Sequence, residues 1–188
     1  MKELILASGS PRRRELLGLF GMPFSVRAAD IDETMDPAKR PGDEVARVSG
    51  CKALAIPREP GDVVIAADTI VVCAGEVLGK PHSREAAIEM LTRLSGREHQ
   101  EMTGCTVLTD DARETFTEVT TLHFRALTQR EIAHYVDTGE PMDKAGAYGI
   151  QGGAALFCTD IQGDYYNVMG LPVCHLGQVL RDFGIWEG

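Results

Sequence analysis

The chain has 188 residues, of which 44% are apolar, a size and composition typical of one folded domain with a sizeable core. Its 28 acidic and 19 basic residues give a formal net charge of −9, which argues against nonspecific binding to nucleic acid or to an anionic membrane. The five cysteines are scattered and show no C-x-x-C spacing, which indicates reduced thiols. No apolar run approaches the roughly 20 residues of a membrane helix, and the N-terminus lacks the pattern of a secretory signal. We therefore expect a cytoplasmic protein with a single domain over residues 1–188.

The first candidate site follows a short apolar run at residues 4–7, which predicts a buried strand. Ser8-Gly9-Ser10 then turns the chain into a helix, for which Ser10 is a suitable N-cap and Pro11 a suitable first residue. Three arginines, Arg12 to Arg14, follow in the first turn, where the helix dipole disfavours each cation by roughly 0.3–1 kcal/mol. That conflict disappears if an anion binds between free N–H groups, serine hydroxyls and guanidinium groups. The alternative is a basic, solvated first turn.

Further along the chain, apolar periodicity and turn residues predict alternating strands and helices. Strands are expected at 24–29, 62–68 and 154–161, a hairpin at 70–72 and 76–78, an antiparallel pair at 101–109 and 114–124, and helices at 43–55, 84–94, 128–138 and 172–183. This pattern indicates an α/β fold with a mixed sheet, in two lobes that share a cleft.

Asp68 is the strongest catalytic candidate, because it ends the most hydrophobic predicted strand and open α/β sheets present ligand groups at strand ends. Beside a divalent metal, such a carboxylate can hold the ion or deprotonate an attacking water molecule. The structural alternative is an aspartate that caps the next turn. Lys80 follows one hairpin later and returns a positive charge to the same edge, as a phosphate partner would.

Two charged features precede that strand. Lys52 falls on the apolar stripe of the predicted helix 43–55, so it either snorkels to the surface or points into a cleft. The acidic segment from Asp30 to Glu33 supplies carboxylates of the kind that Mg²⁺ or Mn²⁺ prefers, although such a segment is often only solvated.

Residues 143–153 form a Gly-rich loop that contains one amide side chain, Gln151. Glycines permit close backbone approach, and an amide can bond both the donor and the acceptor edge of a base. The chain contains no G-x-x-x-x-G-K-[ST], G-x-G-x-x-G, H-E-x-x-H or G-x-S-x-G motif. A phosphate site in this chain must therefore have another design.

Several of these stretches together resemble the Maf family of septum-formation-inhibitor-like nucleotide pyrophosphatases. They are Ser8-Gly9-Ser10-Pro11-Arg12-Arg13, Ala67-Asp68-Thr69, Leu78-Gly79-Lys80-Pro81, residues 143–151 and residues 166–172, in this order over nearly the whole chain. The resemblance implies a Maf/ITPase-like α/β fold, with an elongated mixed sheet flanked by helices and two lobes around a central cleft. It also implies metal-dependent cleavage of a nucleoside triphosphate to the monophosphate and pyrophosphate. Subgroups of the family differ at Arg12, Thr69 and Gln151, and the combination here is similar to the dTTP/UTP pyrophosphatase branch.

On this resemblance, Asp68 is the expected general base, and Glu33 with Asp68 would bind Mg²⁺ or Mn²⁺. The expected substrate-binding residues are Ser8, Ser10, Arg12, Arg13, Lys52, Thr69, Lys80 and Gln151. The expected partner is the triphosphate substrate, with neither nucleic acid nor membrane, and a homodimer is compatible with the family although no interface pattern stands out. Two alternatives stay open: a house-cleaning pyrophosphatase acting on ITP or XTP, and a non-catalytic, nucleotide-binding regulator of septation.

Overall fold

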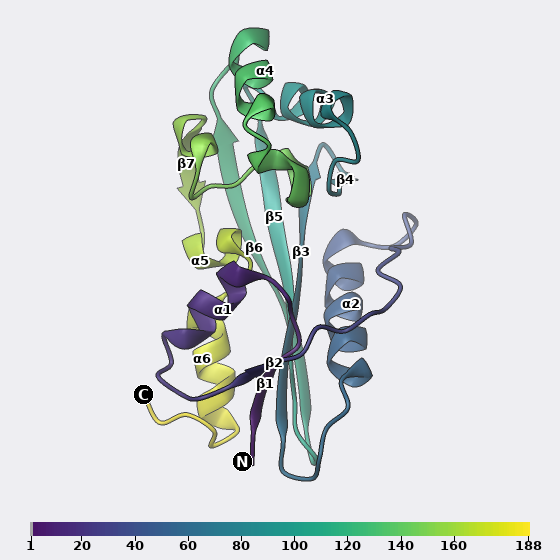
Figure 1. Cartoon of the computed structure of the whole chain (residues 1–188), viewed down its shortest axis with the longest axis vertical. Coiled ribbons are helices and arrows are strands. Elements are labelled where there is room, and N and C mark those ends of the chain that lie inside the picture. The colour runs from purple at the N-terminus through teal and green to yellow at the C-terminus, as the bar shows by residue number, and fades with distance from the viewer. Residues whose placement is uncertain (1) are drawn as a thin grey trace. The chain divides into compact units, whose positions relative to one another are not determined.

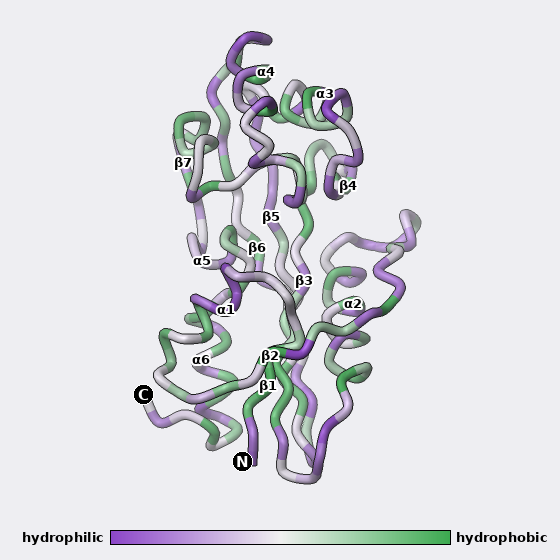
Figure 2. The backbone as a smooth tube through the Cα atoms, viewed as in Figure 1, coloured by the Kyte–Doolittle hydropathy of each residue, from purple (hydrophilic) through white to green (hydrophobic). Residues whose placement is uncertain are grey.

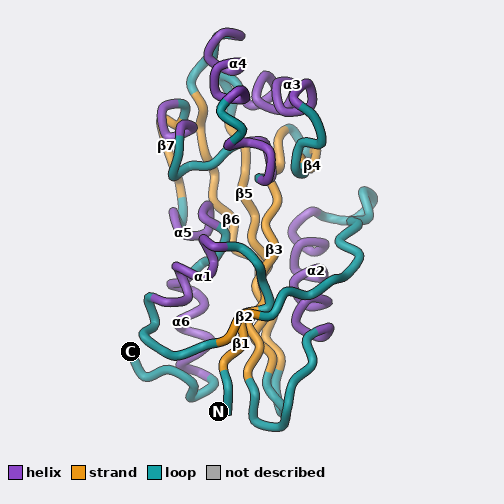
Figure 3. Tube along the Cα trace, viewed as in Figure 1, coloured by secondary structure: helices purple, strands orange, loops and turns teal. Residues whose placement is uncertain are grey.

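In the computed structural model, which describes residues 2–188, seven strands form a mixed sheet in the order β2-β1-β3-β5-β6-β7, with β4 paired to β3 (Figures 1 and 3). The strands are β1 (Leu4–Leu6), β2 (Ser25–Val26), β3 (Val63–Cys73), β4 (Glu76–Leu78), β5 (Glu98–Leu108), β6 (Arg113–Phe124) and β7 (Cys158–Gln162). Strand β1 pairs in parallel with β2 and β3, whereas β4 and β7 pair antiparallel with β3 and β6. The expected mixed sheet is therefore confirmed.

Helices flank this sheet, also as expected. They are α1 (Pro11–Gly18), α2 (Pro41–Ala55), α3 (Arg84–Leu94), α4 (Gln129–Asp137), α5 (Tyr165–Met169) and α6 (Val173–Asp182), with 3₁₀ turns η1 (Glu140–Asp143), η2 (Ala145–Ala147) and η3 (Gly153–Leu156). Within residues 2–188, no helix combines the length and the apolar character needed to cross a membrane.

The chain divides into two compact units, which correspond to the two expected lobes. The first unit comprises the chain up to Asp68, Thr103–Glu118 and Gly170–Gly188, and the second comprises Thr69–Met102 and Val119–Met169. Each unit contains its own segments of β3, β5 and β6, and its own helices.

In the first unit, α2 lies on one side of the strands and α1 and α6 lie on the other (Figure 1). Strand β1 and the first residues of β3 are hydrophobic (Figure 2), and β1 and residues 63–68 of β3 are buried on both faces. Val64 and Ala66 pack with Ala53 and Ile56, at the end of α2. Because strand side chains alternate between faces, Asp68 belongs to the same face of β3 as Val64 and Ala66 and points toward α2.

Helix α2 approaches β5 very closely at Gly104. A Cβ atom at this position would overlap the carbonyl oxygen of Val45 in α2. One turn further along the helix, the Ser49 hydroxyl lies 2.8 Å from the Thr106 hydroxyl in a buried hydrogen bond. The absence of a side chain at Gly104 therefore sets how closely α2, and the polar residues that it carries, sits against the sheet.

The second unit contains the β3–β4 hairpin and the Gly-rich loop. Ala74 and Gly75 both have positive φ angles, of 51° and 82°, which is the geometry of the tight turn predicted at this point. Thr128 and Glu131 form a capping box at the start of α4, which begins close to the predicted position. The amide of Gly146 donates to the carbonyl of Gly79 at 3.1 Å, so the loop after β4 lies against the Gly-rich loop.

Four sequence predictions need correction. Asp68 does not end a strand, because β3 runs without a break from Val63 to Cys73. The strand predicted at 24–29 shrinks to Ser25–Val26, and the one predicted at 154–161 is split between η3 and β7. Between residues 163 and 170, where the sequence predicts neither helix nor strand, the structure has the short helix α5. The polar pair Asp68-Thr69 resembled the end of a strand. The strand continues because Asp68 has a partner, the Lys52 ammonium, so its burial does not interrupt the pairing of β3.

We predict that Gly104→Ala lowers the free energy of unfolding by about 1–3 kcal/mol, because the added methyl group forces α2 away from β5. The matched control is Gly50→Ala in the interior of α2, where the nearest atom to a new Cβ is the Thr106 hydroxyl at 3.9 Å. That substitution should stabilise the protein by about 0.5–1 kcal/mol. Denaturant unfolding of both variants measures the difference, and equal effects would contradict the close approach.

Candidate active site

The start of α1 folds as the sequence predicts. Ser10 is the N-cap, its hydroxyl accepts from the amide of Arg13 at 3.5 Å, and Pro11 is the first helical residue. The Ser8 hydroxyl accepts from the amide of Ser10 and from Nη1 of Arg13, both at 3.2 Å. Arg13 also donates from Nε to the carbonyl of Gly170 at 2.7 Å. The Arg13 guanidinium is therefore tied to the turn before α1 and to the segment before α6.

The guanidinium of Arg13 interacts electrostatically with the carboxylates of Asp68 and Glu33. Burial lowers the pKa of Arg13, while Asp68 and Glu33 act in the opposite direction. The buried thiol of Cys105 lies nearby, and burial raises its pKa to about 12. For Arg13, the alternative of a solvated first turn is therefore wrong, because its charge faces carboxylates and protein interior.

The two neighbouring arginines differ from Arg13. Arg12 is half-buried, and its side chain makes no hydrogen bond or ion pair with any other residue between 2 and 188. Arg14 is exposed to solvent. No protein carboxylate therefore offsets the unfavourable interaction of Arg12 with the helix dipole. This is the situation expected of a residue that binds an external anion.

Lys52 points inward and joins two carboxylates. Its ammonium lies 2.7 Å from Oδ1 of Asp68 and 2.8 Å from Oε1 of Glu33. The side chains of Lys52 and Asp68 are only 10% and 13% exposed, whereas that of Glu33 is 51% exposed. The open question of whether Lys52 snorkels is therefore settled in favour of an inward lysine, held on the face of β3 that α2 covers.

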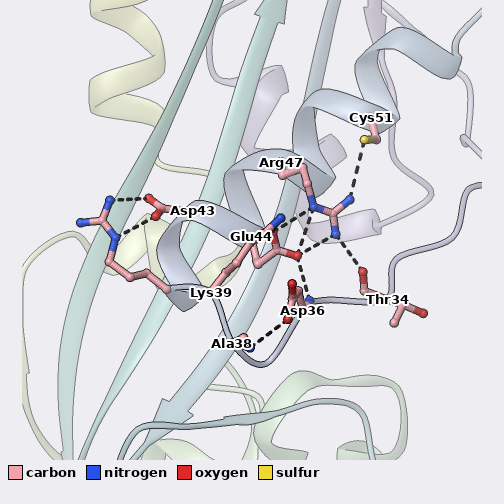
Figure 4. Close-up of polar contacts among 9 residues, drawn as sticks. Thr34, Asp36, Ala38, Lys39, Asp43, Glu44, Arg47 and Cys51 are labelled. Atoms are coloured by element: carbon pink, nitrogen blue, oxygen red, sulfur yellow. Dashed lines mark hydrogen bonds and ion pairs between the residues drawn. The ribbon is translucent and has the colours of Figure 1, made fainter.

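The acidic loop that carries Glu33 is fixed to α2 by a second group of charges (Figure 4). The carboxylate of Glu44, whose side chain is 3% exposed, accepts from the amide of Asp36 at 2.9 Å and from Nη2 of Arg47 at 2.9 Å. Arg47 in turn donates to the carbonyl of Thr34 at 2.8 Å. The same helix therefore positions both Lys52 and the loop that brings Glu33 to it.

Sequence reasoning missed Glu44 and Arg47. Their i, i+3 spacing on a helix is the one local signal that could have pointed to them, but ion pairs at this spacing are usually exposed and weak. What distinguishes Glu44 is the backbone amide of Asp36, a partner eight residues away whose position depends on the fold of the loop.

The remaining predicted site residues belong to the second unit. Thr69 is half-buried, while Lys80 and Gln151 are exposed. The contact between Gly146 and Gly79 places the Lys80 loop beside the loop of Gln151. Neither Lys80 nor Gln151 makes a side-chain hydrogen bond or ion pair within residues 2–188, so both are available to a ligand. Their approach to Asp68 stays a prediction.

The carboxylates of Glu33 and Asp68 suit a divalent cation in one respect. Both direct an oxygen at a single positive centre, the Lys52 ammonium, at 2.8 Å or less. No cluster of three or more His, Cys, Asp or Glu side chains that could hold a metal is found among residues 2–188. Two carboxylates fit Mg²⁺ or Mn²⁺ when phosphate oxygens and water complete the coordination, and they do not form an all-protein metal cage.

We predict that Glu44→Gln destabilises the protein at pH 7 and flattens its loss of stability in acid. Hydrogen bonds from Arg47 and from the Asp36 amide lower the pKa of Glu44 from 4.5 to about 2. A lowered carboxyl pKa contributes stability above about pH 4.5, and that contribution is lost as the pH falls toward 2. The thermal midpoint measured from pH 7 to pH 2 should therefore fall less steeply in the variant.

The control for this experiment is Asp43→Asn, on the same helix. Asp43 pairs with Arg40, but both side chains are exposed, at 56% and 85%, and such pairs contribute little. Asp43→Asn should leave the pH profile almost unchanged. Identical profiles for Glu44→Gln and the unaltered chain would contradict the role of Glu44.

Comparison with known proteins places these features in a family. Residues 3–183 match the family of Maf-like proteins. The dTTP/UTP pyrophosphatase of Symbiobacterium thermophilum is 51% identical over 185 residues, covering 98% of this chain and 95% of the relative. That of Bacillus pumilus is 48% identical over 186 residues, covering 98% of each.

Two solved structures of Ham1 proteins show the same fold. Those from Staphylococcus aureus and Coxiella burnetii align with TM-scores of 0.51 and 0.52 at 15% and 14% sequence identity, covering 97% of this chain and 100% of theirs. The family expected from the sequence motifs is confirmed by the match over residues 3–183: the chain belongs to the Maf-like protein family.

Proposed function

We propose that this chain hydrolyses dTTP and UTP to the monophosphate and pyrophosphate. Relatives that are 45–51% identical over nearly the whole chain are named dTTP/UTP pyrophosphatases. The structural observation that carries the proposal is the ammonium of Lys52, which lies within 2.8 Å of both Asp68 and Glu33. A lysine, an arginine and two carboxylates, drawn from distant parts of the sequence, are the groups that phosphoryl chemistry requires.

In the proposed reaction, a water molecule attacks the α-phosphorus. A bond forms between the water oxygen and phosphorus, the bond from the α-phosphorus to the bridging oxygen breaks, and pyrophosphate leaves with that oxygen. Asp68 accepts the proton of the water as general base. Lys52 binds Oδ1 of Asp68 at 2.7 Å and so orients the carboxylate, which leaves the second oxygen for the water.

The positive and hydroxyl groups would bind the phosphates. We assign this role to Ser8, Ser10, Arg12, Arg13, Lys52 and Lys80. Arg12 and Lys80 support the assignment, because neither is neutralised by an ion pair within residues 2–188. Arg13 is already oriented by Ser8 and Gly170, so it would meet the substrate without reorganisation.

A divalent metal belongs to the proposal, with Glu33 and Asp68 as its protein ligands and Mg²⁺ or Mn²⁺ as the ion. When bound, such an ion neutralises negative charge on the phosphates.

Gln151 and Thr69 would read the uracil or thymine edge, whose carbonyl acceptor and N–H donor match an amide.

We also infer that the two units act as one functional domain, because the family match spans both.

The five cysteines are all free, which supports the expected reducing, cytoplasmic setting. The likeness to the two Ham1 proteins, at 14–15% identity, concerns the fold alone and carries no argument about the substrate. Catalytic release of pyrophosphate by the purified chain would exclude a protein that only binds nucleotides.

Asp68→Asn should reduce turnover of dTTP at least about a hundredfold, because an amide cannot accept the proton of the attacking water. Pyrophosphate release with Mg²⁺, Mn²⁺ or Co²⁺ measures this, and Asp111→Asn in the exposed β5–β6 turn is the matched control. Near-normal turnover by Asp68→Asn would remove Asp68 from the mechanism.

Gln151→Glu should weaken the preference for pyrimidine triphosphates, because a carboxylate repels the carbonyl oxygen of the base and lacks the N–H donor of the amide. Competition among dTTP, UTP, ITP and 7-methyl-GTP measures the ranking. A ranking that the substitution leaves unchanged would refute the proposed role of Gln151.

A further inference from the structure

Gln151 lies in a tight turn at residues 149–152. The amide of Gly152 donates to the carbonyl of Gly149 at 3.0 Å, which closes the turn. Ile150, the first corner residue, is buried with 8% exposure, and Gln151, the second, is exposed. The turn therefore anchors one corner in the core of the second unit and presents the amide of the other to solvent.

Tyr135 of α4 and Glu140 of η1 hold both ends of this turn. The Tyr135 hydroxyl accepts from the amide of Gly149 at 3.0 Å and donates to Oε1 of Glu140 at 2.9 Å. The other carboxylate oxygen of Glu140 accepts from the amide of Gly153 at 3.1 Å. The backbone amides two residues before and two residues after Gln151 are thus bound to one pair of side chains, which we call the Tyr135–Glu140 clamp.

The clamp also explains three glycines of the loop. A Cβ atom at position 152 would overlap the carboxylate of Glu140, and one at position 153 would lie 3.0 Å from the ring of Tyr135. At Gly149 it would lie 2.9 Å from Cε of Lys144 and 3.1 Å from Oε1 of Glu140. From the sequence, these glycines suggested room for a ligand against the backbone. The structure shows that Glu140 and Tyr135 approach Gly152 and Gly153, and that Lys144 and Glu140 approach Gly149.

The clamp is itself rigidly placed. Tyr135 is 4% exposed, and its ring packs edge-on against Phe157 at 5.2 Å between centroids. Burial raises the pKa of Tyr135, so its hydroxyl keeps the proton that it donates to Glu140. Lys144 donates to the backbone carbonyl of Glu140 at 2.7 Å. The Tyr135 hydroxyl, both carboxylate oxygens of Glu140 and its backbone carbonyl therefore all have hydrogen-bond partners.

We propose that the Tyr135–Glu140 clamp is a positioning device that fixes Gln151 for recognition of the substrate base. Neither clamp residue touches the substrate; both act through the backbone of residues 149–153. This inference rests on the proposed function, in which Gln151 reads a pyrimidine edge. Its consequence is that substrate preference depends on a hydroxyl group located on a neighbouring helix.

Tyr135→Phe tests this most directly, because it removes one oxygen and keeps the ring against Phe157. Without the hydroxyl, the amide of Gly149 and Oε1 of Glu140 lose their partner, and the turn is released. We expect the preference for dTTP over ITP to fall about tenfold through a higher KM for dTTP, with kcat much less affected. Hydrogen exchange at the amides of Gly149 and Gly153 should become faster.

A matched control separates positioning from general loss of stability. Val136→Ala, at the next position of α4, removes methyl groups from a residue that is 4% exposed. The valine side chain has no polar atom and therefore makes no hydrogen bond to Tyr135 or Glu140. It should destabilise the protein at least as much as Tyr135→Phe and leave the preference for dTTP unchanged. An equal loss of preference in Val136→Ala would overturn the inference.

A double-variant experiment identifies Gln151 as the residue that the clamp acts on. In a Gln151→Ala background, Tyr135→Phe should cause no further loss of preference, because the side chain that it positions is absent. Additive losses would overturn the inference. Should Tyr135→Phe fold poorly, Glu140→Gln takes its place, since an amide cannot accept from both Tyr135 and Gly153 through the two terminal atoms.

The outcomes also distinguish this inference from the proposed function. If the unaltered chain releases no pyrophosphate from dTTP or UTP, the proposed function fails, and the inference fails with it. If the chain is active and Gln151→Ala changes the preference but Tyr135→Phe does not, the function stands and only the clamp inference is overturned.

Discussion

The contact of the Lys52 ammonium with Asp68 and Glu33 is the interaction on which the candidate site depends. Removing charged groups such as Lys52 and Asp68 from water costs on the order of several kcal/mol per ion unless they are paired in good geometry. The pairing is possible only because α2 lies close against the sheet, with Gly104 providing the space for the backbone of Val45. The ion cluster and the packing of α2 therefore depend on each other, and a shift of the helix would separate Lys52 from the carboxylate on β3.

Two loops of the chain are held by the same kind of device. In the first unit, Glu44 accepts from the guanidinium of Arg47 and from the backbone amide of Asp36, which fixes the loop of Glu33. In the second, Glu140 accepts from the hydroxyl of Tyr135 and from the backbone amide of Gly153, which fixes the turn of Gln151. In both cases a carboxylate combines a side-chain donor with a loop amide. An irregular segment thereby gains a defined position without a regular hydrogen-bond ladder.

Local signals in the sequence were sufficient for several elements. Ser10-Pro11 predicted the start of α1, and periodicity with turn residues predicted the helix from residue 128 and the hairpin at 70–78, because each depends on residues only a few positions apart. The inward direction of Lys52 was left open, because its partners lie 16 and 19 residues away along the chain. The polar pair at Asp68 concealed the continuation of β3, since periodicity does not reveal that a buried carboxylate has a lysine partner. Motif resemblance identified the family where local physics gave only separate candidates.

The glycines of the 143–153 loop show that a Gly-rich motif near a candidate site can serve the packing of the protein itself and not the binding of a ligand. A Gly-rich segment close to a candidate recognition residue suggests that the ligand needs the space. Here Gly152 and Gly153 lie against Glu140 and Tyr135, so the space is already occupied by protein side chains. The small residues serve the placement of Gln151, and the exposed amide remains the group that is free to contact a ligand. Selectivity in such a loop then depends on the side chains that hold its backbone as much as on the one that faces the substrate.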